Sequence, residues 1–320
     1  TYSFGGRNFG SPEADRPGPK DMRLAIVASS NVYFYSLANE MGVDLIHDQL
    51  EPFGLGRHTG IDLMGEVTGD LPSQEWKRKK FRKTEQQKWF AGETISLGIG
   101  QGYNNFTMLQ MATAYATIAS GGLRFKPRLV REIKDSVQHT TQRVASDALE
   151  PLPLKAEHVD VIRNAMHGVT VEGTSARVFA GAGYTSGGKT GTAQAVGLRA
   201  GEKYSSVKTD EHKRDHSLYV AFAPAENPTI ALALIVENAG WGSGSAAPIA
   251  RRVFDYWLMG QYPNEDDMAA VRKGQAMAPI GKPLVAADVP LPRTGASAAA
   301  LPLAASSTAA QTSAAVSTPR

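Results

Sequence analysis

Residues 184–194 bring together the side chains of this chain that are best suited to hold an anion. The segment reads YTSGGKTGTAQ, so Lys189 lies among hydroxyl side chains and closely spaced glycines. A lysine ammonium beside a hydroxyl donates hydrogen bonds to a carboxylate or a phosphate. Glycines let such a ligand approach the backbone, because no Cβ stands in the way. The segment therefore predicts an anion-binding site, and its function depends on which anion it binds.

Two motifs overlap in this segment. Residues 183–190 match the G-x-x-x-x-G-K-T pattern of a nucleotide-binding P-loop. Residues 189–191 spell K-T-G, which lies on an active-site strand of penicillin-recognising serine enzymes. A P-loop is followed by a helix, whereas the threonines and glycines after Lys189 favour a strand. The apolar segment 230–237 with its terminal acid favours nucleotide binding, and a glycine-rich turn with a solvated lysine needs no ligand at all.

The segments that must position Lys189 are predicted from apolar periodicity and from turn residues. Helices are expected over residues 19–28, 32–41, 44–53, 106–120, 156–171 and 247–259, and strands around residue 189, over 217–223 and over 229–237. Residues 54–104 are predicted to have little regular structure. The strands are close in sequence, so we expect them to be antiparallel neighbours.

This order of elements predicts a mixed α/β fold of the α+β kind, with an antiparallel sheet and a helical subdomain. The alternation of strands and helices that a P-loop fold requires is missing, which disfavours nucleotide binding. Residues 1–265 are predicted to form one domain, and residues 266–320, which are rich in Ala, Pro and Ser, to be a disordered tail.

Composition excludes several classes of site. The chain has no cysteine, which excludes disulfides and thiolate metal sites, and the spacing of its histidines predicts no metal centre. No apolar run is long enough to span a membrane. Much of the net charge of +3 comes from the basic run at residues 77–83. No aromatic platform or recognition helix accompanies that run, so we predict a solvated surface loop and no nucleic-acid partner.

A second motif, Ser29-Ser30-Asn31, precedes the K-T-G segment. On its own S-x-N is explained by a helix cap, but it gains meaning ahead of a K-T-G strand. With both motifs in this order, the chain resembles the transpeptidase domain of the penicillin-binding protein 2 family, class B enzymes that crosslink peptidoglycan during cell elongation. The resemblance covers about residues 1–262 and rests on segments 29–42, 60–62, 76–83, 98–103, 189–194, 214–216 and 221–224.

The resemblance implies a fold like that of serine β-lactamases and three motifs, S-x-x-K, S-x-N and K-T-G. By this resemblance, Ser29 would pass protons between the lysine of the nucleophile and the leaving amine. Asn31 would hold amide groups of the substrate.

The K-T-G strand would bind the rest of the substrate. Lys189 and Thr190 would bind the terminal carboxylate of a D-Ala-D-Ala stem peptide or of a β-lactam. Gly191 would let the ligand lie along the strand. The backbone N–H of Thr192 would form half of an oxyanion hole.

One departure from the family pattern concerns the nucleophile. The family places S-x-x-K upstream of S-x-N, and residues 1–28 contain no such string. Two strings occur elsewhere, at Ser186–Lys189 and at Ser205–Lys208. The first has glycines where a helical turn is needed, and the second follows the K-T-G strand. We therefore expect a domain that is incomplete at its N-terminus, with the nucleophile upstream of Thr1.

The resemblance also implies a location and partners. The family works on the periplasmic face of the bacterial inner membrane, with an anchoring helix expected upstream, and with a RodA-type glycosyltransferase and an MreC-type scaffold as partners. No cofactor is implied. Two alternatives stay open: a D,D-carboxypeptidase or β-lactamase, in which water replaces the acceptor amine, and a non-catalytic interaction module in cell-wall synthesis.

Overall fold

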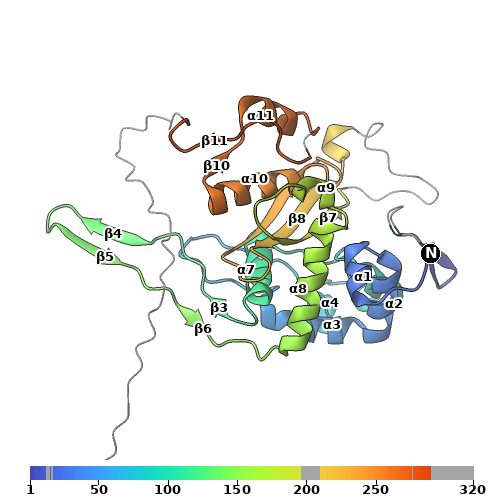
Figure 1. Cartoon of the computed structure of the whole chain (residues 1–320). Helices are drawn as coiled ribbons and strands as arrows, with labels where there is room; N and C mark the ends of the chain where they lie inside the picture. The colour runs from blue at the N-terminus through green and yellow to red at the C-terminus, as the bar shows by residue number, and fades with distance from the viewer. Residues whose placement is uncertain (12–14, 16, 196–209, 276, 290–320) are drawn as a thin grey trace, which may run out of the picture.

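A computed structural model of the chain describes residues 1–11, 15, 17–195, 210–275 and 277–289 (Figure 1). A small hairpin opens it, and helices follow. These elements are β1 (Tyr2–Phe4), β2 (Arg7–Phe9), α1 (Met22–Val27), α2 (Asn31–Met41), α3 (Val43–Leu50) and the 3-10 turn η1 (Glu51–Phe53). The predicted helices over 19–28, 32–41 and 44–53 are thus confirmed, with slightly different bounds.

The central sheet contains the K-T-G segment. Its strands are β7 (Gly187–Ala193), β8 (His216–Ala223) and β9 (Ile230–Val236), in the order β7-β8-β9. Both pairs are antiparallel, and Lys189 lies opposite Val220. The antiparallel sheet is therefore confirmed. Lys189 and Thr190 lie inside a strand and not at a helix N-terminus, so the P-loop interpretation is wrong.

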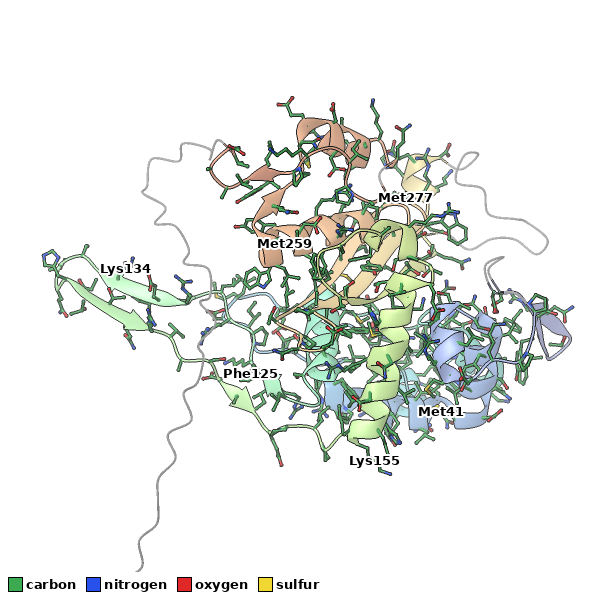
Figure 2. The ribbon with its side chains drawn as sticks, in the orientation of Figure 1. Met41, Phe125, Lys134, Lys155, Met259 and Met277 are labelled. Carbon is green, nitrogen blue, oxygen red and sulfur yellow. The ribbon has the colours of Figure 1, made fainter. Side chains whose placement is uncertain are left out.

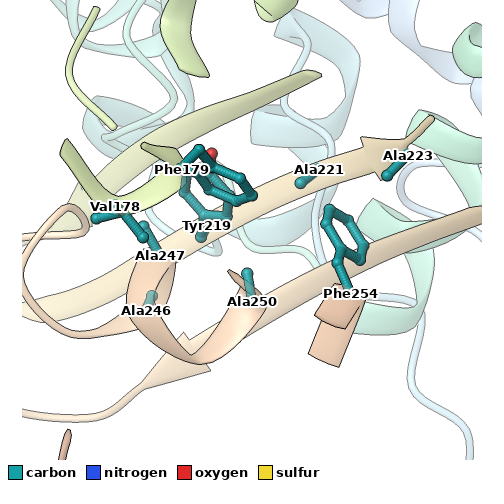
Figure 3. Close-up of a cluster of buried hydrophobic side chains, with 9 residues drawn as sticks. All are labelled: Val178, Phe179, Tyr219, Ala221, Ala223, Ala246, Ala247, Ala250 and Phe254. Carbon is teal, nitrogen blue, oxygen red and sulfur yellow. The ribbon is translucent and has the colours of Figure 1, made fainter. Parts of the chain in front are cut away.

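Helices cover both faces of this sheet (Figure 1). On one face, Phe222 of β8 packs with Ala119 of α7 (Met108–Ala119) and Met166 of α8 (Ala156–Val171). On the other, Tyr219 packs with Phe254 of α10 (Ala246–Met259) and with α9 (Ala176–Phe179), as Figure 3 shows. Side chains alternate along a strand, so Lys189 points to the face of α7 and α8, and Thr190 to the face of α9 and α10.

Residues 54–104 contain more structure than the sequence indicates. They include α4 (Gln74–Lys80), α5 (Thr84–Gln87) and α6 (Ala91–Leu97), so the prediction of little regular structure is wrong. Helix α4 lacks an apolar stripe, so the spacing of apolar residues does not predict it. A cap marks its start instead, because the Ser73 side chain accepts a hydrogen bond from the N–H of Trp76.

Lys77 corrects the prediction for the basic run. Its side chain is 2% exposed, and its ammonium donates to Glu93 at 2.5 Å and to the carbonyl of Lys88 at 2.8 Å. It also lies 5.3 Å from the ring centres of Trp89 and Tyr103. A buried ammonium needs such partners to offset lost hydration. The run therefore begins in a helix with a buried lysine and is not a solvated loop throughout.

Short strands complete the fold. The hairpin of β4 (Glu132–Asp135) and β5 (Thr140–Arg143) projects from the body as an arm, near Lys134 in Figure 2, and β3 (Arg124–Phe125) pairs with β6 (Ala148–Leu149) at its base. The 3-10 turn η2 (Glu211–Lys213) precedes β8.

The tail that composition predicts to begin at residue 266 starts with structured segments. Helix α11 (Glu265–Arg272) is tied to α10, because Asp267 pairs with Arg252 in a buried contact of 2.5 Å. Strand β10 (Gln261–Tyr262) pairs with β11 (Leu284–Val285). Structure thus extends past residue 265, and residues 290–320 lie outside the described part of the chain.

Candidate active site

The side chains of Lys189 and Ser29 meet, although they lie 160 positions apart in the sequence. Lys189 is half-buried on β7, and its ammonium donates a 2.5 Å hydrogen bond to the hydroxyl of Ser29. A second bond, of 3.0 Å, goes to the carbonyl of Thr190. The structure thus brings the S-x-N serine and the K-T-G lysine, two of the predicted site residues, into direct contact.

Burial lowers the pKa of Lys189 to about 8, well below that of a free lysine. The cause is desolvation, which disfavours the charged form. An amine with such a pKa exchanges protons readily near neutral pH, and its charged form still binds a carboxylate. The Lys189–Ser29 pair is therefore suited both to anion binding and to proton transfer.

Ser29 occupies the turn between α1 and α2 in an unusual backbone conformation. Its φ is 54°, in the left-handed region that residues with a side chain seldom adopt. Such a conformation costs about 1–2 kcal/mol. Its N–H donates to the carbonyl of Ile26 at 3.2 Å. Strain of this kind clusters at functional sites, where surrounding contacts hold it in place.

Asn31, the third residue of the motif, begins helix α2. Its backbone N–H donates to the hydroxyl of Ser11 at 2.9 Å. The structure thus places Asn31 two residues from Ser29, at the first turn of α2.

Thr190 and Thr192 each have a neighbour that sequence reasoning missed. The Thr190 hydroxyl lies 3.0 Å from that of Thr174, which follows helix α8. The side chain of Gln101 donates to the carbonyl of Thr192 at 3.3 Å. Gln101 belongs to the segment 98–103 that carries part of the family resemblance, so that segment was its available signal; nothing in the sequence marks Thr174.

The glycines of this strand are explained by close packing. A Cβ at Gly188 would lie 2.1 Å from the hydroxyl oxygen of Tyr219, which leaves no room for a side chain. A Cβ at Gly191 would lie 3.1 Å from the Cβ of Leu218. A side chain at Gly191 would therefore crowd Leu218 on β8, whatever the role of Gly191 toward a ligand.

The S-x-x-K string at Ser186–Lys189 does not form a nucleophile site. Ser186 is 2% exposed and immediately precedes β7, and its carbonyl accepts bonds from His167 and Thr170. This extended backbone confirms that Ser186 and Lys189 do not lie on one helical turn. Ser205–Lys208 lies outside the described residues.

Two cavities lie away from this site. One of about 360 Å³ is bounded by α3, α4 and the segment 55–73, and a second of about 320 Å³ adjoins it. The charged groups of the first form ion pairs with close neighbours, such as Glu51 with Arg57 and Glu75 with Lys79. The Ser29–Lys189 pair is the better candidate site, because a lysine with a lowered pKa donates there to a serine hydroxyl.

A three-stranded antiparallel sheet between helices, with K-T-G on its edge strand and an S-x-N serine bonded to the lysine, defines the class of penicillin-recognising serine enzymes. The chain matches the penicillin binding protein transpeptidase domain over residues 3–255. It therefore belongs to the family of penicillin-binding protein transpeptidase domains.

The relatives agree with this assignment. The peptidoglycan D,D-transpeptidase MrdA of Haemophilus influenzae is 36% identical over 250 residues, which are 77% of this chain and 37% of the relative. Pseudomonas aeruginosa penicillin-binding protein 2, solved in complex with WCK 5153, is 34% identical with a TM-score of 0.66, over 83% of this chain and 53% of that one. Helicobacter pylori penicillin-binding protein 2, solved in complex with MreC, is 25% identical with a TM-score of 0.64, over 80% and 44%.

The chain thus spans about two fifths to half of the length of these relatives. Among the described residues, no helix has the length and apolar character needed to cross a membrane.

Proposed function

We propose that this chain supplies the S-x-N and K-T-G parts of a peptidoglycan-crosslinking D,D-transpeptidase of the elongation type. The observation that carries the proposal is the 2.5 Å bond between the Lys189 ammonium and the Ser29 hydroxyl. It links the two motifs in the way that a proton path between nucleophile and leaving group requires. The match to the transpeptidase domain family and the MrdA relatives support the same assignment.

The reaction assigned to the site is acyl transfer in two steps. A serine oxygen attacks the carbonyl carbon of the penultimate D-alanine, the C–N bond breaks, and the terminal D-alanine leaves after its nitrogen receives a proton. An acceptor amine then attacks the ester, the C–O bond breaks, and the serine regains its proton. A β-lactam stops this sequence after the first step, because its leaving group stays attached.

Each residue of the site has a role in this proposal. Ser29 carries the proton to the leaving nitrogen, and Lys189 and Thr190 bind the terminal carboxylate. The N–H of Thr192 stabilises the oxyanion, a contribution often worth about 3 kcal/mol. Asn31 orients the substrate amide. Gly191 keeps the strand edge open.

The nucleophile is assigned to an S-x-x-K motif outside these 320 residues, since Ser186 lies buried immediately before strand β7. The membrane anchor is likewise assigned to polypeptide beyond this chain, with the domain on the periplasmic face of the inner membrane. A RodA-type glycosyltransferase and an MreC-type scaffold are the proposed partners. The complex of the Helicobacter pylori relative with MreC supports the second.

The test uses the polypeptide that carries this chain together with the S-x-x-K motif. It is incubated with a D-Ala-D-Ala stem peptide and an amino-containing acceptor peptide, and the products are separated by mass. The proposal predicts a crosslinked dimer, and a penicilloyl adduct that persists for hours. Release of D-alanine without a dimer would identify a carboxypeptidase, and rapid release of the penicilloyl group a β-lactamase. No adduct at all would point to a non-catalytic interaction module.

A further inference from the structure

The carboxylate of Asp15 stands next to the S-x-N turn and is almost completely buried. Its side chain is 5% exposed. It accepts hydrogen bonds from Ser30 at 2.7 Å and from Ser11 at 2.5 Å, and it pairs with the ammonium of Lys20 at 2.8 Å. Burial raises the pKa of Asp15, but these three partners outweigh burial and hold the pKa below its usual value. The group is therefore a carboxylate at neutral pH.

This carboxylate fixes both residues that follow Ser29. Ser30 is 3% exposed and donates directly to Asp15. The N–H of Asn31 donates at 2.9 Å to the hydroxyl of Ser11, which in turn donates to Asp15. One buried charge thus holds the Ser30 side chain and, through one hydroxyl, the start of helix α2.

Ser29 needs such support, because its left-handed backbone is unfavourable for a residue with a side chain. On its N-terminal side, the turn is held by the bond from the Ser30 N–H to the carbonyl of Ala25, at 2.8 Å. On its C-terminal side, the support comes from the Asp15 cluster. Release of that cluster would let the turn relax and would move the Ser29 hydroxyl away from Lys189.

We propose that Asp15 is a positioning residue, which acts through Ser30 and Ser11 to hold Ser29 in the turn that places its hydroxyl against Lys189. The consequence for catalysis rests on the proposed function, and the consequence for the geometry does not. Asp15 itself touches no reacting atom.

The catalytic test measures acylation by a fluorescent penicillin in the polypeptide that carries the S-x-x-K motif. Asp15→Ala is expected to lower the acylation rate constant about 100-fold, the size of effect that a displacement of about 1 Å produces. Ser30→Ala should lower it about tenfold. Non-covalent affinity should change little in either variant, because Lys189 and Thr190 are untouched.

A double variant separates positioning from general loosening. If Asp15 acts through Ser30, the Asp15→Ala/Ser30→Ala variant is no slower than Asp15→Ala alone. The proposal would be overturned if the rate loss of the double variant equalled the product of the two single losses. It would also be overturned if Asp15→Ala were acylated at a rate within twofold of the wild type. If Asp15→Ala does not fold, Ser30→Ala decides, and a wild-type rate there contradicts the proposal.

Glu172→Gln is the matched control. It removes the exposed ion pair of Glu172 with Arg23 on helix α1, and neither of these two side chains is hydrogen-bonded to Ser30 in the described part of the chain. Its acylation rate should stay within twofold of the wild type.

A second readout does not depend on activity. Hydrogen exchange of the 25–34 peptide should rise at least tenfold in Asp15→Ala, while a peptide from α8 keeps its protection. If the wild type is not acylated at all, the proposed function fails, and this exchange result still decides the role of Asp15. Unchanged exchange over residues 25–34 would overturn it.

Discussion

Lys189 donates a 2.5 Å hydrogen bond to Ser29, and this contact connects the N-terminal helices to the edge strand of the sheet. Ser29 lies in a strained turn, and Lys189 lies in a short strand. Their contact is what turns two short motifs into one site. Its chemistry leads to predictions for the lysine, its neighbours and the surrounding fold.

Removal of the Lys189 ammonium should slow the acylation step most. Lys189→Ala is expected to lower the second-order rate constant of penicillin acylation by about 10²–10³-fold, because the carboxylate loses its counter-charge and Ser29 its partner. Lys213→Ala removes an exposed lysine paired with Asp210 and should leave the rate unchanged. The rates are measured with a fluorescent penicillin, and equal losses in both variants would contradict the assignment.

The pKa of Lys189 predicts a pH dependence. Burial lowers that pKa to about 8, so the ammonium that binds a carboxylate is present below pH 8 and disappears above it. The second-order rate constant of acylation should therefore fall about tenfold per pH unit above pH 8. A pH profile from 6 to 10 checks this, and a rate that stays flat or rises above pH 8 would disagree with it.

The same lowered pKa affects stability in the opposite sense. The unfolded chain keeps the Lys189 proton up to about pH 10.5, whereas the folded chain loses it near pH 8. The free energy of unfolding therefore rises with pH in this window, because the unfolded state binds more protons. The difference between wild type and Lys189→Met in urea melts at pH 7 and pH 10 isolates this effect. The wild type should gain stability relative to Lys189→Met between pH 7 and pH 10.

Thr174 should support substrate binding through the Thr190 hydroxyl, 3.0 Å away. Thr174→Val removes one hydroxyl at nearly constant shape and should weaken the affinity for a β-lactam about fivefold, the value of one hydrogen bond. Thr174→Ser keeps the hydroxyl and should bind like the wild type. If valine and serine behave alike, the hydroxyl contact has no function in binding.

The buried pair of Lys77 and Glu93 should matter for stability and not for chemistry. Glu93→Ala leaves the ammonium of Lys77 buried without its counter-charge, which should cost about 3 kcal/mol in urea unfolding. Glu75→Ala breaks an exposed pair with Lys79 and should not change the melt measurably. A small effect at Glu93 would mean that the Lys88 carbonyl and the aromatic rings suffice for Lys77.

The sequence allowed prediction of the elements that follow local rules. The strand around Lys189, its antiparallel neighbours and most helices are confirmed, because glycine, β-branched residues and apolar spacing act over short distances. The helices within residues 54–104 escaped prediction, because their stability comes from tertiary contacts such as Lys77 with Glu93. For the same reason the sequence did not reveal Asp15 or Thr174, whose partners are brought close only by the fold. The pairing of Ser29 with Lys189 was accessible only through the family resemblance.

The central claim is that Ser29 and Lys189 serve a nucleophile outside these 320 residues, and mapping of the penicilloyl adduct tests it most directly. The polypeptide with the S-x-x-K motif is incubated with penicillin and digested, and the modified peptide is sequenced by mass spectrometry. The account predicts a single adduct on a serine outside residues 1–320, which Lys189→Ala diminishes. An adduct on Ser186 or on any other serine of this chain would contradict it.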